Sequence, residues 1–418
     1  MKEQIIFYGV GQHTQVNYHQ LIAKGLSPLC FVDDDAHKQN TKLFGHDILS
    51  LEEALRRYPD SEFYLTIDKH NLRVGNKNLL EVFENLIKIG IPEERIKFVN
   101  PMEQRKGCVI LEGQPHISSN NIWICCAVPD EDKMQSIQYD NLKDGLESYY
   151  NAVSAIVKRI KSSQSTMCDD CVYLQEDFWS ITPRVNCFIF EGDFKGDFCN
   201  FKCCYCGKAA LYEEGYRKEG RDFLDTLRQI GELFDKGEIS LNLANGEITS
   251  RPDCDEILEF VQSKQWPVIL TTNASIYKEK VADLICAGLM YFMIVSLDAG
   301  TSETFHKVKG VDCFDIVAEN LRQYSALGAD IKLKYILLEG LNDNDEDIDN
   351  FVEIVANLNA TCRLSANIYT RRNRLSKYAL DAAISMINKC KERNLRMECL
   401  YENFHILDRK TLKMAFDR

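Results

Sequence analysis

The stretch "GDFCNFKCCYCGK", residues 196–208, contains four of the chain's 17 cysteines. Cys199, Cys203 and Cys206 have the spacing C-x-x-x-C-x-x-C, and Cys204 lies between the last two. Three thiolates on one short loop can each bind one iron of a [4Fe–4S] cube and leave the fourth iron open. Two other interpretations remain: a zinc knuckle, which needs a fourth ligand such as Cys204, and a group of buried thiols.

Strand-like and helical patterns alternate from residue 185 onward. The strand-like runs are "VNCFIF", "ISLNLA", "PVILTT", "YFMIVSLD", "IKLKYILL" and "CRLSANIY". Six strands separated by crossover helices predict an α/β fold, a partial (β/α)6 barrel of the TIM type, over residues 185–418. The cysteine loop follows the first strand. It would therefore lie at the carboxyl ends of the strands, where such folds place their active sites.

The cysteine loop, with the aromatic Tyr205 inside it and a strand before it, resembles the signature of the radical S-adenosylmethionine (SAM) family. Later strand ends resemble the SAM-contacting motifs of that family. "LANGEI" resembles its glycine–glutamate motif, with Asn245 in place of the usual first glycine. A turn at Gly246 and helix capping at Ser296 and Asp298 are the alternative roles. The residues that the resemblance assigns to SAM binding are Tyr205, Gly246, Glu247, Asn273, Ser296 and Asp298.

The resemblance covers about residues 185–400 and implies a chemistry. SAM would bind the open iron of the [4Fe–4S] cluster, and one electron from the reduced cluster would cleave it to methionine and a 5′-deoxyadenosyl radical. That radical would abstract hydrogen from a substrate, while the protein binds, orients and excludes water. An electron donor such as a flavodoxin or a ferredoxin is also implied. No catalytic residue on the substrate side is identified.

Residues 106–184 are irregular, and we expect a small cysteine-containing linker subdomain there. Part of it resembles the auxiliary-cluster half-motifs of twitch and SPASM modules, although those modules usually follow the barrel. A fourth ligand would come from Cys108 or Cys187. A second [4Fe–4S] cluster, a structural zinc ion and plain buried thiols all remain open. The cysteines that carry this resemblance are Cys125, Cys126, Cys168 and Cys171.

Residues 1–105 alternate strand-like and helical patterns, which predicts a Rossmann-like parallel sheet. A G-x-G sequence follows the first strand, but Thr14 replaces the third glycine of the dinucleotide fingerprint. The segment resembles the nucleotide-sugar-binding domain of bacterial sugar acetyltransferases. A domain used only for docking or oligomerisation is the alternative. The residues that would bind a nucleotide are Gly9, Gly11, Gln12 and Asp33.

The composition of the chain argues against some classes of function. The formal net charge of −13 argues against a protein that coats nucleic acid or binds membranes through a polybasic surface. No apolar segment approaches membrane-spanning length, and the N-terminal apolar run is broken by glycines, so we expect no signal peptide and a cytoplasmic location.

Three functional hypotheses follow. The leading one is a radical SAM enzyme that modifies a small molecule such as a nucleotide-sugar or a surface-polysaccharide precursor. The second is a peptide-modifying radical SAM enzyme. The third is a non-catalytic metal- or nucleotide-binding regulator, against which the three-cysteine loop argues, because a regulator does not need an open iron.

Overall fold

The computed structural model describes residues 4–11, 14, 18, 21–36, 38–66, 79–125, 134–169, 171, 173–208, 215–244, 246–368 and 373–417. The chain divides into two compact units. The N unit comprises Met1–Gln114, Val128–Met134 and Ser148–Asn186, and the C unit comprises Pro115–Ala127, Gln135–Glu147 and Cys187–Arg418. The predicted linker subdomain, 106–184, is divided between these two units.

The N unit contains a six-stranded sheet with the order β3-β4-β2-β1-β5-β6. All neighbours except β3 and β4 pair in parallel, and the strand order reverses at β1, which lies between β2 and β5. The parallel α/β sheet predicted for this part of the chain is therefore observed, and its Rossmann-like classification stays a prediction. The strands are β1 (Ile5–Tyr8), β2 (Pro28–Val32), β3 (Lys42–Leu43), β4 (His46–Leu49), β5 (Glu62–Leu65) and β6 (Ile96–Phe98).

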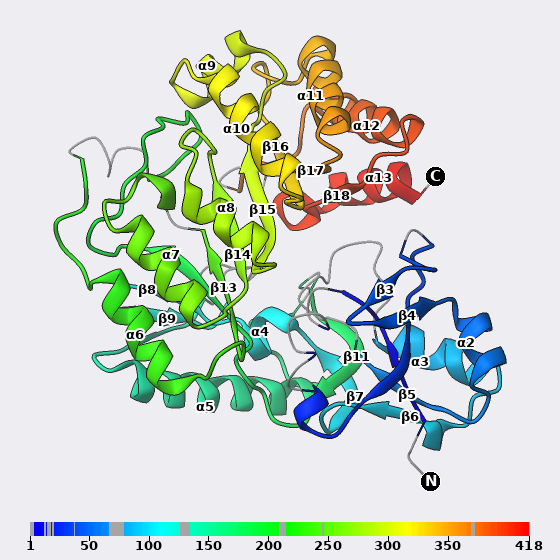
Figure 1. Cartoon of the computed structure of the whole chain (residues 1–418). Helices are drawn as coiled ribbons and strands as arrows, with labels where there is room; N and C mark the ends of the chain where they lie inside the picture. The colour runs from blue at the N-terminus through cyan, green and yellow to red at the C-terminus, as the bar shows by residue number, and fades with distance from the viewer. Residues whose placement is uncertain are drawn as a thin grey trace. The chain divides into compact units, whose positions relative to one another are not determined.

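Helices α2 (Leu51–Arg57) and α3 (Leu79–Lys88) lie beside this sheet (Figure 1). Helix α2 begins at Ser50, whose hydroxyl accepts a hydrogen bond from the backbone N of Glu53 at 3.2 Å, as expected for a helix cap. The N unit also contains the antiparallel pair β7 (Met102–Gly107) and β11 (Gln175–Ser180), and the short helix α4 (Val109–Gly113). Helix α5 (Leu142–Lys161) contributes residues to both units.

The C unit contains a ten-stranded sheet with the order β10-β9-β8-β12-β13-β14-β15-β16-β17-β18. Strands β12 to β18 are parallel and follow one another in chain order, and they include all six predicted strands. The observed order is consistent with a partial barrel, whose closure stays a prediction. These strands are β12 (Cys187–Gly192), β13 (Ser240–Leu243), β14 (Val268–Thr272), β15 (Met290–Ser296), β16 (Ile331–Leu337), β17 (Thr361–Ala366) and β18 (Met397–Cys399).

One edge of this sheet was not expected. Strand β8 (His116–Ser118) pairs in parallel with β12, and β9 (Asn121–Trp123) and β10 (Ser136–Gln138) extend the edge in antiparallel pairing. The sequence analysis had placed these residues in the linker subdomain. They join the larger sheet because all three residues of β8 are buried, which a three-residue strand achieves only against a neighbouring strand.

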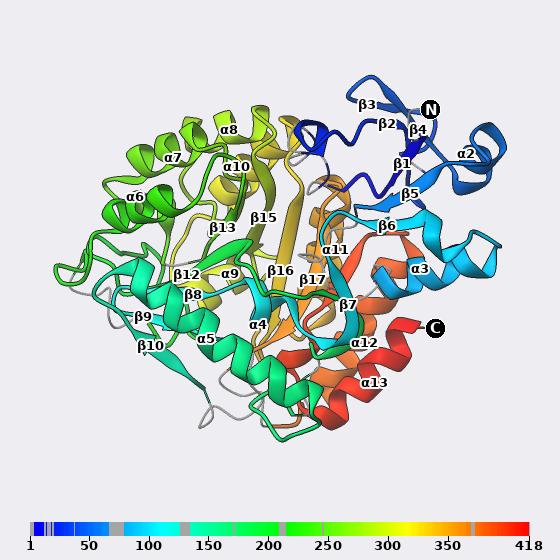
Figure 2. The same ribbon diagram turned by 90° about the horizontal axis from the view of Figure 1, so that it is seen from below.

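The two faces of the C-unit sheet differ in composition. One face is apolar and packs against helices: the Phe190 ring contacts Phe223 at the start of α6, and Tyr335 contacts Phe351 on α11. Figures 1 and 2 show α6, α7 and α8 running along one side of β13–β15. The helices are α6 (Phe223–Leu233), α7 (Cys254–Ser263), α8 (Glu279–Cys286), α9 (Ser302–Lys309), α10 (Phe314–Ala326), α11 (Asp345–Asn357), α12 (Lys377–Glu392) and α13 (Ile406–Asp417).

The opposite face, which we call the inner face, carries the alternate residues of each strand. It carries polar and charged side chains among apolar ones such as Ile189 and Phe292: the polar ones include His116, Asn242, Lys332, Lys334 and Arg363. No helix in the described part of the chain is long and apolar enough to cross a membrane.

Candidate functional site

The cysteine loop follows β12 and is fixed to the end of helix α9. The backbone N of Lys202 donates to the carbonyl of Lys309 at 3.0 Å, and the backbone N of Cys204 donates to the carbonyl of Val308 at 2.9 Å. Helix α9 ends at Gly310, whose φ of 71° lies in the left-handed region that glycine adopts without strain. The two residues on either side of Cys203 are thus held by backbone hydrogen bonds.

The three predicted ligands lie near one another on this loop. The pKa of the Cys199 thiol is raised to about 12, chiefly by burial and in smaller part by the charges of Glu247, Cys203 and Cys206. Burial also raises the pKa of Cys203, while the Lys309 ammonium acts to lower it. Iron binding would have to displace these protons, because the thiolate is the ligand.

A single metal ion and an iron–sulfur cube make different demands on three thiolates. No three His, Cys, Asp or Glu side chains in the described ranges form a group that could hold one ion. In a cube each thiolate binds a different iron, so the three sulfurs need not converge on one point.

Tyr205 and Asp298, both predicted to contact SAM, belong to one buried cluster. The Tyr205 hydroxyl donates to Asp298 Oδ2 at 2.5 Å. Lys309 Nζ donates to the Tyr205 hydroxyl at 2.8 Å and forms an ion pair with Asp298. Lys309 and Asp298 are 1% and 0% exposed, so this is a charge pair removed from water. Its members come from the cysteine loop, the end of β15 and the end of α9.

The Asp298 carboxylate is fully engaged in holding the strand ends. Its Oδ1 accepts from the backbone N of Ile336 at 2.6 Å, and its own carbonyl accepts from Asn342 Nδ2 at 2.8 Å. Asp298 has a φ of 55°, which suits the turn after β15. These contacts favour a role in positioning Tyr205 and Lys309 rather than direct contact with SAM.

Glu247 joins the ends of β13 and β14. Its buried carboxylate accepts from the backbone N and the hydroxyl of Thr249, the hydroxyl of Thr272 and the backbone N of Asn273, at 2.5–3.2 Å. Burial raises the pKa of this carboxyl, although these donors act in the opposite direction. The backbone N of Glu247 donates to the carbonyl of Phe198 at 2.7 Å, so the motif is bonded directly to the cysteine loop.

The other predicted SAM-binding residues lie at the same strand ends. Asn273 Nδ2 donates to Asn200 Oδ1 at 2.8 Å, which adds a side-chain link to the cysteine loop. Gly246 has a φ of 52°, a conformation that favours glycine. Ser296 is the last residue of β15, and Asn245 lies outside the described residues.

The sequence analysis missed Lys309 and His116. No motif marks Lys309, which lies on a helix more than 100 positions from the tyrosine it contacts. His116 Nδ1 lies 2.5 Å from Glu191 Oε1, across 75 positions of sequence. The cations of the inner face did leave a signal, because "IKLKY" places lysines at alternate positions of an otherwise apolar strand.

The described part of the predicted nucleotide loop leaves β1 through Gly9 and is bonded to the chain at the end of β2. The backbone N of Gly9, whose φ is 108°, donates to the carbonyl of Val32 at 2.8 Å. Asp33 Oδ2 accepts from the backbone N of Val10 at 3.0 Å. A side chain at Gly11 would meet open space, and Gln12 lies outside the described residues.

The predicted auxiliary cysteines belong to different units. Cys168 and Cys171 lie in the N unit, where the backbone N of Cys171 donates to the carbonyl of Cys168 at 3.1 Å. The pKa of Cys168 is raised to about 11, chiefly by burial and in smaller part by Cys171. Cys125 lies buried in the C unit, and Cys126 lies outside the described residues.

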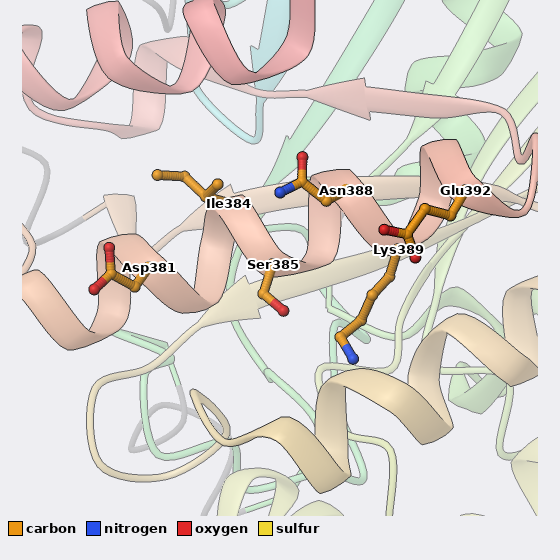
Figure 3. Close-up of a pocket in the computed structure, with 6 residues that line it drawn as sticks. All are labelled: Asp381, Ile384, Ser385, Asn388, Lys389 and Glu392. Carbon is orange, nitrogen blue, oxygen red and sulfur yellow. The ribbon is translucent and has the colours of Figure 1, made fainter. Parts of the chain in front are cut away.

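Two surface hollows are lined by residues other than the predicted site residues. One, of about 410 Å³, is lined by side chains that all project from α12 (Figure 3). The other, of about 710 Å³, is in the N unit and borders the turn of Cys168 through Thr166 and Asp169. Neither hollow is lined by a predicted SAM-binding residue. The residues that line the first are Asp381, Ile384, Ser385, Asn388, Lys389 and Glu392.

Comparison with known proteins identifies the core of the C unit. Residues 195–352 match the family described as the Radical SAM superfamily. The chain carries a radical SAM domain. The match includes the cysteine loop, the Gly246–Glu247 motif and Asp298, and the prediction of this family, with a [4Fe–4S] cluster and SAM as its cofactors, is confirmed at the level of the domain.

Curated relatives match the same region. A probable GTP 3′,8-cyclase of Saccharolobus islandicus (strain L.S.2.15 / Lassen #1) is 32% identical over 162 residues, which cover 38% of this chain and 50% of the relative. A GTP 3′,8-cyclase of Stenotrophomonas maltophilia (strain R551-3) is 32% identical over 154 residues, which cover 35% of this chain and 45% of the relative. The chain thus spans about half the length of the curated relatives it matches.

Solved structures resemble the chain more distantly. Streptococcus suis SuiB shows 15% identity and a TM-score of 0.40, over 63% of this chain and 55% of that one. A radical SAM methyltransferase from Sphaerobacter thermophilus shows 11% identity and a TM-score of 0.39, over 78% of this chain and 94% of that one.

The buried Lys309–Asp298 pair yields a prediction about stability. Replacing Lys309 with Met leaves a buried carboxylate without its cation, so we expect unfolding of the C unit to become easier by about 3 kcal/mol. Lys307→Met on the same helix removes an exposed ion pair with Glu303 and should leave the free energy of unfolding nearly unchanged. Urea unfolding of the metal-free protein, followed by circular dichroism, measures both values. Equal effects of the two substitutions would show that Lys309 does not support the fold.

Proposed function

We propose that the C unit is the catalytic core of a radical SAM enzyme. Cys199, Cys203 and Cys206 would hold a [4Fe–4S] cluster with one open iron, and Cys204, which lies outside their spacing, would not be a ligand. The observation that carries the proposal is the three-cysteine loop at the carboxyl end of β12, bonded to the ends of β13 and β14 within the matched region.

Bound and reduced, the cluster supplies the electron that cleaves SAM and so generates the radical that abstracts hydrogen from the substrate. The protein's residues bind and orient. Glu247 fixes the turns after β13 and β14, where the Gly246 and Asn273 backbones would face SAM. Tyr205, held by Asp298 and Lys309, supports the loop at Cys203. A flavodoxin or ferredoxin would deliver the electron.

The substrate we propose is a phosphorylated small molecule such as a nucleotide or a nucleotide-sugar. Support comes from the curated relatives, whose names specify a reaction of GTP. The N unit adds a glycine turn next to a strand end at the point where the strand order reverses, a position at which parallel sheets bind nucleotides.

Loss of the three cysteines tests the proposal. The Cys199→Ala/Cys203→Ala/Cys206→Ala variant should lose about four irons per chain and all formation of 5′-deoxyadenosine from SAM, because each thiolate holds one iron. Anaerobic reconstitution, iron analysis and chromatography after addition of dithionite measure both quantities. Cys204→Ala is the matched control and should keep both. A chain that cleaves SAM without Cys203 but not without Cys204 would refute the ligand assignment.

The auxiliary cysteines give a separate prediction. If Cys168, Cys171 and a cysteine of the 125–126 pair hold a second [4Fe–4S] cluster, the reconstituted wild type contains about eight irons per chain. The triple variant of the cysteine loop then keeps about half of them. Zinc in place of iron in that variant would identify a structural zinc site. No metal at all would leave Cys168 and Cys171 as thiols without a metal-binding role.

A further inference from the structure

Lys309 brings a buried positive charge to the cysteine loop. It is the last residue of α9, and its carbonyl accepts the hydrogen bond from the backbone N of Lys202, the residue before Cys203. Its side chain is 1% exposed, and Nζ lies 2.8 Å from the Tyr205 hydroxyl and 5.1 Å from the centre of the Tyr205 ring. Tyr205 lies between the predicted ligands Cys203 and Cys206 in the sequence, so the ammonium group contacts the segment that carries them.

The charge of Lys309 acts on Cys203 more strongly than the charge of its partner Asp298 does. Burial has the largest effect and raises the pKa of the Cys203 thiol. Lys309 acts to lower that pKa, and Asp298 acts to raise it with a smaller effect. The ion pair therefore leaves a net positive influence at Cys203, although the pair itself is neutral.

The hydrogen bonds of the Asp298 carboxylate offset part of its negative charge. Its Oδ1 accepts from the backbone N of Ile336 at 2.6 Å, and its Oδ2 accepts from the Tyr205 hydroxyl at 2.5 Å and from Lys309. Donors at both oxygens stabilise the ionised carboxyl group. The positive charge of Lys309 therefore stays in place, because its counter-charge is held ionised beside it.

A nearby positive charge changes how readily an iron–sulfur cluster is reduced. Reduction adds one electron, so a cation close to the cluster stabilises the reduced state, and the charge around a cluster is among the factors that set its reduction potential. The interaction is stronger in a buried site, where the dielectric constant is low, than in water. The surroundings of Cys203 thus affect electron uptake as well as the conformation of the loop.

We propose that Lys309 raises the reduction potential of the cluster that the cysteine loop holds, and that Asp298 limits this effect. The inference rests on the proposed function and adds to it a residue that controls how easily the electron donor reduces the cluster. A purely mechanical role of the ion pair makes a different prediction. Loss of either partner would then disturb the loop without regard to the sign of the charge that is lost.

Redox titration of the reconstituted protein without SAM, followed by electron paramagnetic resonance, tests the inference. The signal of the loop cluster is the one that the triple cysteine variant lacks. We expect Lys309→Met to lower the midpoint potential, so that the ratio of reduced to oxidised cluster at a fixed potential falls about tenfold, or by about 59 mV for a one-electron couple. Asp298→Asn should shift the midpoint in the opposite direction, because it removes the negative charge and leaves the ammonium group.

Three further variants complete the test. Lys309→Arg keeps the positive charge and should keep the midpoint near that of the wild type. Lys307→Met removes an exposed charge from the same helix and should leave the midpoint unchanged, because water and salt screen that charge. The double variant Lys309→Met/Asp298→Asn buries no unpaired charge and should lower the midpoint by less than Lys309→Met does. It decides the test if either single variant fails to bind iron.

Two results would overturn the inference: shifts of the same sign in Lys309→Met and Asp298→Asn, or a wild-type midpoint in Lys309→Met or in the double variant. Iron content and SAM cleavage of the same preparations separate this inference from the proposed function. A wild type that binds the loop cluster and cleaves SAM, with variants whose midpoints do not follow the charges, contradicts the inference alone. A wild type that takes up no cluster in the loop contradicts the proposed function.

Discussion

The buried ion pair of Lys309 and Asp298 is the interaction on which the candidate site depends. Cysteine ligands on a loop are useful only if the loop returns to one conformation, and loops are the mobile part of most folds. Here the pair holds the Tyr205 hydroxyl from one side, and two backbone hydrogen bonds from the end of α9 hold the chain on either side of Cys203. The cost of burying two charges is offset by their attraction and by the donors that surround Asp298.

The same pair couples the strand ends to the loop. The Asp298 carboxylate accepts a hydrogen bond from the backbone N of Ile336. The Glu247 carboxylate links the turns after β13 and β14 by accepting four hydrogen bonds. Both carboxylates are buried acceptors with little room for a further donor. The acidic residues at these strand ends therefore act first as supports, and SAM would meet the backbone and hydroxyl groups that they position.

The sequence predicted the parts of the site that are local. The cysteine spacing, the strand before it and the polar residues at later strand ends can each be recognised within a few positions, and Tyr205 and Asp298 do lie together. Contacts between distant segments could not be predicted. Lys309 meets Tyr205 only because α9 ends against the cysteine loop, and β8 joins the large sheet because its three residues need a partner for burial. The inner-face cations were visible as alternate lysines in a buried strand, but their shared partner Glu398 lies 66 positions from Lys332.

The central claim is that the cysteine loop holds a cube whose open iron binds SAM. Electron paramagnetic resonance of the reduced, reconstituted protein with and without SAM tests it most directly, because a ligand on the iron alters the spectrum of the cluster. The account predicts a [4Fe–4S] signal that changes on addition of SAM and is absent when Cys199, Cys203 and Cys206 are replaced. A cluster signal from the intact loop that SAM leaves unchanged would contradict it.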